Sequence, residues 1–236
     1  MKAPIILAVD TSDFDTAIAW IEATKDSVSV YKLGLEFYLN FGSVGVSRVI
    51  SQTGAEIFLD LKLHDIPHTV ASAAKAIEKL EPKFLTVHAS GGMAMVKAAA
   101  DAVPNVAVTA VTILTSLSEG DLSEIGYAGP ALESAVALAK LAVGAGAKAI
   151  VCSPLETAAI RGAVGKGPII ITPGVRPLAD VGADDQVRTM TPADAIAAGA
   201  NYVVIGRPIT KHWAVGASAM TAIARLMADE ILSAIA

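Results

Sequence analysis

The chain has 236 residues, with 18 Lys+Arg, 23 Asp+Glu and a formal net charge of -5. This length suits one large α/β domain with a sizeable core, and the acidic balance argues against a broad nucleic-acid or anionic-membrane footprint. Hydrophobic residues make up 53% of the chain and aromatic residues only 5%, which is typical of buried parallel strands covered by small-residue helices.

Strand-like runs alternate with segments of helical periodicity along the chain. The predicted strands are Ile5–Asp10, Ser29–Gly34, Glu56–Leu63, Phe84–His88, Val106–Leu114, Ala149–Ser153, Ile169–Pro173 and Tyr202–Gly206. Helical periodicity is found over Asp13–Thr24, His68–Leu80, Ala131–Val143 and Pro192–Ala198, and again after Trp213. Eight such units predict an α/β protein with a single domain, 1–236, folded as a closed (β/α)₈ TIM barrel.

An open doubly wound sheet is the competing topology, and it normally carries a glycine-rich turn after its first strand. Here that turn reads Asp10-Thr11-Ser12-Asp13, without glycine. No linker rich in Pro, Ser or Gly divides the chain. The closed barrel is therefore favoured.

No apolar stretch reaches the roughly 20 residues that a membrane-spanning helix needs. Met1-Lys2-Ala3-Pro4 runs directly into a strand-like segment without the pattern of a signal peptide. The single Cys152 excludes an internal disulfide, which suits a reducing compartment. We therefore expect a cytoplasmic protein with neither a membrane nor a nucleic acid as its partner.

The segment Asp60-Leu61-Lys62-Leu63-His64-Asp65-Ile66-Pro67 places three charges at the end of a predicted buried strand. Alternation along that strand puts Phe58, Asp60 and Lys62 on one face and the leucines on the other. An isolated buried charge costs several kcal/mol even after relaxation. These charges must therefore pair with one another or meet a ligand.

Charged residues also occur on the neighbouring predicted strands. In a parallel barrel the functional groups gather at the carboxyl ends of the strands. Asp10 ends the first predicted strand and Lys32 lies on the second. With Asp60, Lys62 and Asp65 they can alternate as acid, base, acid, base, acid. A structural ion pair that plugs the barrel is the alternative for the third strand alone, but barrel interiors are mostly apolar, so the whole set favours a functional site.

Two further segments suggest a phosphate site and a lid. The run Tyr202–Ile209 ends an apolar strand in Gly206 followed by Arg207, a pattern typical of phosphate binding after the last barrel strand; a surface arginine after a turn is the alternative. The polar stretch Pro177–Arg188 is too long for an ordinary βα turn and suggests a lid over the ligand, or else a long surface loop.

Metal binding is not expected. The four histidines and Cys152 lack the spacing of metal ligands, and Cys152 is better interpreted as a buried thiol. Asp60 and Asp65 can in principle hold magnesium, but Lys62 between them would compete with the ion. The hydroxyls of Val111–Ser116 can bind a heterocycle or simply cap the next turn.

Six segments resemble the orotidine 5'-phosphate decarboxylase family, and the similarity extends over essentially the full length. They are Leu7–Asp10, Lys32–Gly34, Asp60–Pro67, Val111–Ser116, Thr172–Pro177 and Ile205–Ile209. The resemblance implies decarboxylation of orotidine 5'-monophosphate to UMP in pyrimidine biosynthesis, without metal or cofactor. It also implies a homodimer whose active sites are built across the subunit interface.

The resemblance also implies individual roles. Lys62 matches the lysine that protonates pyrimidine carbon 6, Asp60 the carboxylate beside the departing carboxyl group, and Lys32 the lysine that holds this array and a ribose hydroxyl. The other implied positions are Asp10 at the ribose; Asp65, Ile66 and Thr69 contributed by the partner subunit; Thr115 and Ser116 at the pyrimidine edge; and Arg176, Gln186, Gly206 and Arg207 at the phosphate end and closing loop. One departure is His68, where many members of the family have Asn.

Two other functions compete with this one. The keto-gulonate-phosphate and hexulose-phosphate decarboxylases share the Asp-x-Lys-x-x-Asp pattern but use magnesium and typically have an acid on the second strand, where this chain has Lys32. A catalytically silent nucleotide-binding or scaffold barrel is the other. It predicts that removing the Lys62 side chain leaves ligand affinity largely intact and that no carbon dioxide is released from orotidylate.

Overall fold

A computed structural model of the protein describes residues 2–175 and 190–235. Eight parallel strands close into a barrel, in which each strand pairs with the next along the chain and the last pairs with the first. The strands are β1 (Ala3–Ala8), β2 (Val28–Leu33), β3 (Ile57–Leu63), β4 (Phe84–His88), β5 (Ala107–Val111), β6 (Ala149–Val151), β7 (Ile169–Thr172) and β8 (Tyr202–Ile205). This is the (β/α)₈ TIM barrel that the sequence predicts.

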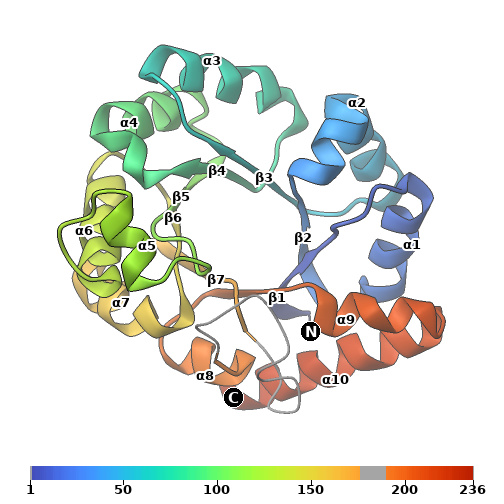
Figure 1. The fold of residues 1–236 in the computed structure, drawn as a ribbon. Helices are drawn as coiled ribbons and strands as arrows, with labels where there is room; N and C mark the ends of the chain where they lie inside the picture. Colours follow the sequence, from blue (N-terminus) through green and yellow to red (C-terminus); the bar gives the residue numbers. More distant parts are fainter. Residues whose placement is uncertain (1, 176–189, 236) are drawn as a thin grey trace.

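Helices form a ring outside the strands (Figure 1). They are α1 (Phe14–Thr24), α2 (Leu35–Thr53), α3 (Pro67–Ile77), α4 (Gly92–Ala102), α5 (Glu119–Glu124), α6 (Ala131–Gly144), α7 (Thr157–Val164), α8 (Pro192–Ala197), α9 (Arg207–Thr210) and α10 (Ala217–Ile235). Short 3₁₀ segments lie at Glu78–Leu80, Ala89–Gly91, Pro154–Glu156 and Lys211–Ala214. In the described part of the chain, no helix is both long and apolar enough to cross a bilayer.

The core has two layers, because alternate residues of each strand face the helices or the barrel axis. Leu59 belongs to the large outer cluster between strands and helices, whereas Phe58 faces inward. The inner cluster consists of Ile6, Val30, Phe58, Phe84, Ala149 and Ile171. Phe58 and Phe84 pack edge to face with ring centroids 5.6 Å apart near the beginnings of β3 and β4, so the barrel is filled below its carboxyl-terminal mouth.

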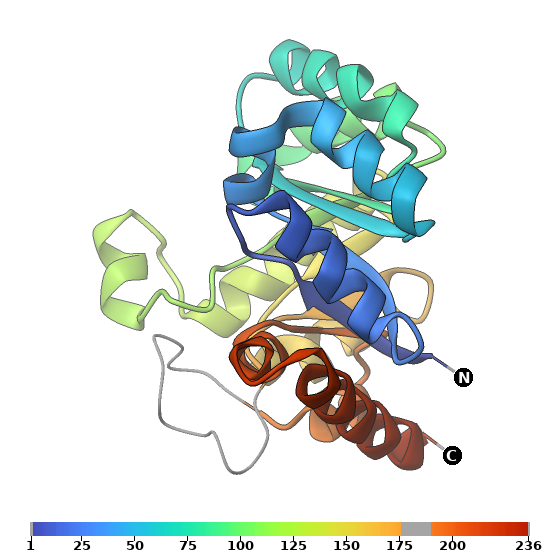
Figure 2. The same cartoon turned by 90° about the vertical axis from the view of Figure 1, so that its right-hand side faces the viewer.

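Local sequence signals fix the loops that surround this mouth. Asp13 accepts a hydrogen bond from the backbone N–H of Thr16 (2.6 Å) and caps α1 directly after the first βα loop. Pro67 is the first residue of α3, where its missing N–H costs nothing. Figure 2 shows α5 standing away from the barrel wall on the side of the carboxyl ends of the strands.

Three strands end two or three residues earlier than the sequence predicts. β5 ends at Val111 instead of Leu114, because the Thr112 N–H and hydroxyl both donate to the carbonyl of Val151 (3.0 Å each) and the chain then turns. β6 ends at Val151 instead of Ser153, since Ser153 caps the 3₁₀ turn that follows. β1 ends at Ala8, so the predicted strand-end residue Asp10 lies in the βα loop.

Candidate active site

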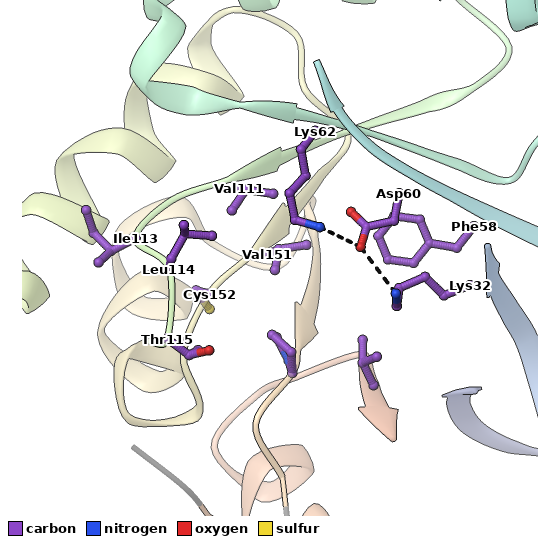
Figure 3. Close-up of a pocket in the computed structure, with 12 residues that line it drawn as sticks. Lys32, Phe58, Asp60, Lys62, Val111, Ile113, Leu114, Thr115, Val151 and Cys152 are labelled. Atoms are coloured by element: carbon purple, nitrogen blue, oxygen red, sulfur yellow. Dashed lines mark hydrogen bonds and ion pairs between the residues drawn. The ribbon is translucent and has the colours of Figure 1, made fainter. Parts of the chain in front are cut away.

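Four charged side chains form a continuous chain at the carboxyl ends of β1, β2 and β3. The Lys32 Nζ lies 3.1 Å from Asp10 Oδ1 and 3.5 Å from Asp60 Oδ2. The Lys62 Nζ lies 2.8 Å from the same Asp60 oxygen. The two ammonium groups approach Asp60 from different sides (Figure 3). The alternation of acid and base expected from the sequence is therefore confirmed for these four residues.

Asp60 and Lys32 stay ionised although both are largely removed from water. Burial alone would raise the pKa of Asp60, which is 7% exposed, but the ammonium groups of Lys32 and Lys62 and the hydrogen bonds to Asp60 hold that pKa below its usual value. Burial would likewise lower the pKa of Lys32, but Asp60 and Asp10 raise it. The result is a set of prearranged charges in a poorly solvated position, where electrostatic interactions are strong.

Thr86 on β4 completes this array and is not among the site residues predicted from the sequence. Its hydroxyl donates to Asp60 Oδ1 (2.9 Å) and accepts a hydrogen bond from the backbone N–H of Lys62 (2.8 Å). The residue is wholly buried. A signal was present, because Thr86 is the polar inward position between Phe84 and His88 on an otherwise apolar strand.

A cavity opens beside these four charged side chains, with one polar wall and one largely apolar wall. Lys32, Asp60 and Lys62 form the polar wall. The other lining residues are Phe58, Val111, Ile113, Leu114, Thr115, Val151, Cys152, Pro173 and Val204. Figure 3 shows the ammonium groups on one side of this space and the side chains that follow β5 and β6 on the other. A largely apolar pocket with a few fixed charges is suited to a small ligand that carries a charged reacting group.

Only some of the residues expected at the pyrimidine and phosphate ends of the ligand line the cavity in the described part of the chain. Thr115 lines the cavity, whereas Ser116 lies exposed in the following turn. Gly206 directly follows β8 and lies close to β1, where a Cβ atom would lie 3.2 Å from that of Ala8. Arg207 begins α9 on the exposed surface beside it. The predicted positions Arg176 and Gln186, with the predicted lid Pro177–Arg188, lie outside the described residues.

Asp65, Ile66 and Thr69 lie at the outer rim, where α3 begins. The Asp65 carboxylate accepts a hydrogen bond from the backbone N–H of Ile66 (2.6 Å) and is not part of the charged chain within this subunit. All three residues are exposed, and the apolar Ile66 side chain is 65% exposed. The fifth charge of the expected alternation is therefore not brought to the other four by its own subunit.

Other titratable groups near the cavity include His64, His88 and Cys152. Among the residues that the structure describes, no three His, Cys, Asp or Glu side chains are grouped as metal ligands. His64 and His88 stack with ring centroids 5.4 Å apart, and burial lowers the pKa of His88, as do the charges of His64 and Lys62. Burial raises the pKa of Cys152 to about 12, which agrees with the buried, unreactive thiol that the sequence predicts.

Comparison with known proteins gives a consistent result along the chain. The family model described as "Orotidine 5'-phosphate decarboxylase / HUMPS family" matches residues 3–221. The chain is 50% identical over 226 residues to the orotidine 5'-phosphate decarboxylase of Thermobifida fusca (strain YX), covering 96% of this chain and 97% of that protein. It is 42% identical over 241 residues to the protein of the same name from Gluconobacter oxydans (strain 621H), covering 99% of each.

A solved structure agrees with the sequence comparisons. The crystal structure of orotidine 5'-phosphate decarboxylase from Lactobacillus acidophilus superposes with a TM-score of 0.82 at 34% identity, covering 98% of this chain and 99% of that one. Fold, sequence and the charged segment Asp60–Pro67 thus lead to one assignment. The chain belongs to the orotidine 5'-phosphate decarboxylase / HUMPS family.

Proposed function

We propose that this protein is a carboxy-lyase that converts orotidine 5'-monophosphate to UMP in pyrimidine biosynthesis. The observation that carries the proposal is the chain of Asp10, Lys32, Asp60 and Lys62 beside a largely apolar cavity. The curated relatives that match nearly the whole chain are named for this reaction. The geometry offers what the reaction needs most, which is a cation held in place beside a largely apolar cavity.

The difficult step is the loss of carbon dioxide from carbon 6 of the pyrimidine. When the bond between carbon 6 and the carboxylate breaks, the electron pair stays on carbon 6 in an orbital that is not conjugated with the ring carbonyls. The enzyme must therefore stabilise a localised negative charge. We assign this role to the Lys62 ammonium, which then delivers a proton to carbon 6, so that UMP and carbon dioxide are the products.

Asp60 and Lys32 prepare this ammonium before the substrate arrives. Asp60 Oδ2 holds the Lys62 Nζ at 2.8 Å, and Lys32 supports the same oxygen from the other side at 3.5 Å. We place the departing carboxyl group beside Asp60 and a ribose hydroxyl near Lys32 and Asp10. Because the charges are fixed by one another, little reorganisation is needed as the transition state forms.

We assign the phosphate to the loop after β8, where Gly206 brings the backbone close and Arg207 provides a planar set of donors. Arg207→Ala is expected to raise KM for orotidylate roughly 10- to 100-fold, since it removes a charge-assisted interaction far from the reacting carbon. Steady-state kinetics on the nucleotide measure this. Arg225→Ala, an exposed arginine on α10, is the matched control, and unchanged kinetics for Arg207→Ala would contradict the phosphate assignment.

A magnesium-dependent sugar-phosphate decarboxylase is the alternative, and a chelator distinguishes the two. Orotidylate consumption, followed by absorbance, is expected to proceed at the same rate with and without EDTA, because the ammonium groups around Asp60 oppose a cation there. Activity that EDTA abolishes and magnesium restores would favour the metal-dependent reading. No consumption under either condition would favour a silent nucleotide-binding barrel.

We further propose that the active unit is a homodimer in which Asp65, Ile66 and Thr69 of one subunit reach the site of the other. Their exposure at the rim beside the charged chain supports this arrangement, and so does the exposed apolar side chain of Ile66. The cytoplasmic location that the sequence suggests stays a prediction.

A further inference from the structure

The pairing of β3 with β4 is interrupted at the active site. Leu59 pairs with Leu85 and Leu63 pairs with Val87, so three residues of β3 lie opposite Thr86 alone. An insertion of this kind is a β-bulge, and bulges beside active sites redirect side chains that a regular strand would place elsewhere. The three residues opposite Thr86 are Asp60, Leu61 and Lys62, two more than a regular ladder would hold. They include both charged groups assigned to the reacting end of the substrate.

The bulge leaves Lys62 in an unfavourable backbone conformation. Its φ is 49°, in the left-handed region, and in the described chain only one other non-glycine residue, Glu81, has a positive φ. A long side chain on an L-residue is strained in this region, so the conformation persists only where neighbours hold it. The neighbour in contact with the Lys62 backbone is the Thr86 side chain, because the N–H of Lys62 donates to Thr86 Oγ1 at 2.8 Å.

The same hydroxyl also fixes the carboxylate of Asp60. A threonine hydroxyl has one proton to donate and two lone pairs to accept with. Here the proton is donated to Asp60 Oδ1 (2.9 Å), while a lone pair accepts from the Lys62 backbone. Asp60 Oδ1 is therefore committed to Thr86, and Oδ2 is turned to the two ammonium groups. Thr86 does not line the cavity and so acts only through these two residues.

We propose that Thr86 is a positioning residue for the decarboxylation, whose single hydroxyl sets both the Lys62 backbone and the Asp60 carboxylate in the geometry that catalysis requires. This inference rests on the proposed function. Thr86 contacts neither the reacting carbon nor the phosphate, and its effect is expected in turnover rather than in substrate binding. Thr109 on β5 is the register partner of Thr86, but its hydroxyl bonds only to the carbonyl of Ala107.

Thr86→Val tests the proposal because valine keeps the branched shape and removes the hydroxyl. We expect kcat to fall by about 10- to 100-fold, since two hydrogen bonds are lost, one of them a buried bond to a charged group, while KM changes little. Thr86→Ser retains the hydroxyl and is expected to recover most of the loss. Thr109→Val removes a buried hydroxyl of the neighbouring strand and is the matched control, expected to leave kcat near that of the parent.

The pH profile separates positioning from a general loss of structure. Asp60 is faced by Lys32, Lys62 and Thr86, with His88 nearby, and it must be ionised to hold the ammonium groups. The Thr86 hydroxyl helps to lower the pKa of Asp60, so its removal raises that pKa and moves the acid limb of the kcat profile to higher pH. A loss of folded protein would instead scale kcat equally at every pH and leave the limb in place.

The outcomes test the positioning role of Thr86 separately from the proposed decarboxylase activity. No carbon dioxide from the parent protein with orotidylate would overturn the proposed function and, with it, this role. An active parent whose Thr86→Val variant keeps its kcat and acid limb would overturn the positioning role alone. If the valine variant does not fold, Thr86→Ala carries the same expectation without risk of overpacking, and its thermal unfolding reports that it is folded.

Discussion

Lys62→Ala is expected to lower kcat for orotidylate by about 10⁴-fold or more. The change removes a general acid, worth roughly 10²- to 10⁴-fold, together with a fixed charge worth roughly 10²- to 10³-fold. It also leaves Asp60 with Lys32 as its remaining ammonium partner in a poorly solvated site. Release of carbon dioxide in single-turnover experiments, with enzyme in excess over orotidylate, measures the residual rate directly.

The matched control is Lys97→Ala, which removes a lysine from the exposed surface of α4, where it pairs only with Asp101 one turn away. Its kcat is expected to equal that of the parent. UMP affinity of Lys62→Ala, measured by calorimetry, tests whether the site is still formed. If the kcat of Lys62→Ala stays within about tenfold of the parent value, Lys62 is not the proton donor.

The fold was predictable because its determinants are local and repeat along the chain. Each strand is a short apolar run and each helix has its own periodicity, and short alternating connections leave few topologies other than a parallel barrel. The charges of the site were predictable for a related reason. Lys32, Asp60 and Lys62 stand out on strands that are otherwise apolar, and the barrel places the ends of those strands side by side.

What could not be predicted depends on interactions between strands. The bulge in β3 follows from the register with β4, and a sequence of alternating residues gives no indication that three of them will face one. Thr86 appears an ordinary strand residue until this register places its hydroxyl between Asp60 and Lys62. The early end of β5 likewise depends on the carbonyl of Val151, 39 residues from its partner Thr112.

Asp65 marks a different limit, because in the proposed homodimer it takes its place in the alternation from a second subunit. Within one subunit its carboxylate caps the N–H of Ile66 at the rim and does not reach Lys62. The amino-acid sequence can indicate that a charged residue belongs to a site. It cannot indicate whether that residue acts in the site of its own subunit or in that of a second subunit. This question is open to a direct test, since each proposed site needs Lys62 from one subunit and Asp65 from the other.

Mixing inactive Lys62→Ala and Asp65→Ala subunits is expected to restore activity from background to about a quarter of the parent sites. Random exchange makes half of the dimers hybrid, and one of the two sites in each hybrid combines an intact Lys62 with an intact Asp65. The kcat of those restored sites is expected to equal that of the parent. The measurement is carbon dioxide release after subunit exchange, with hybrid formation verified by tagging one variant and separating the species chromatographically.

The control mixture contains Asp65→Ala subunits and subunits that carry both substitutions, so that no hybrid site has an intact pair. It is expected to stay at background although exchange proceeds equally well. Recovery in the first mixture and not in the second can arise only if the two side chains act across the interface, because neither subunit regains its own missing group. Absence of recovery in verified hybrids would show that Asp65 acts within its own subunit. The segment that carries Asp65 before α3 would then have to move toward Lys62.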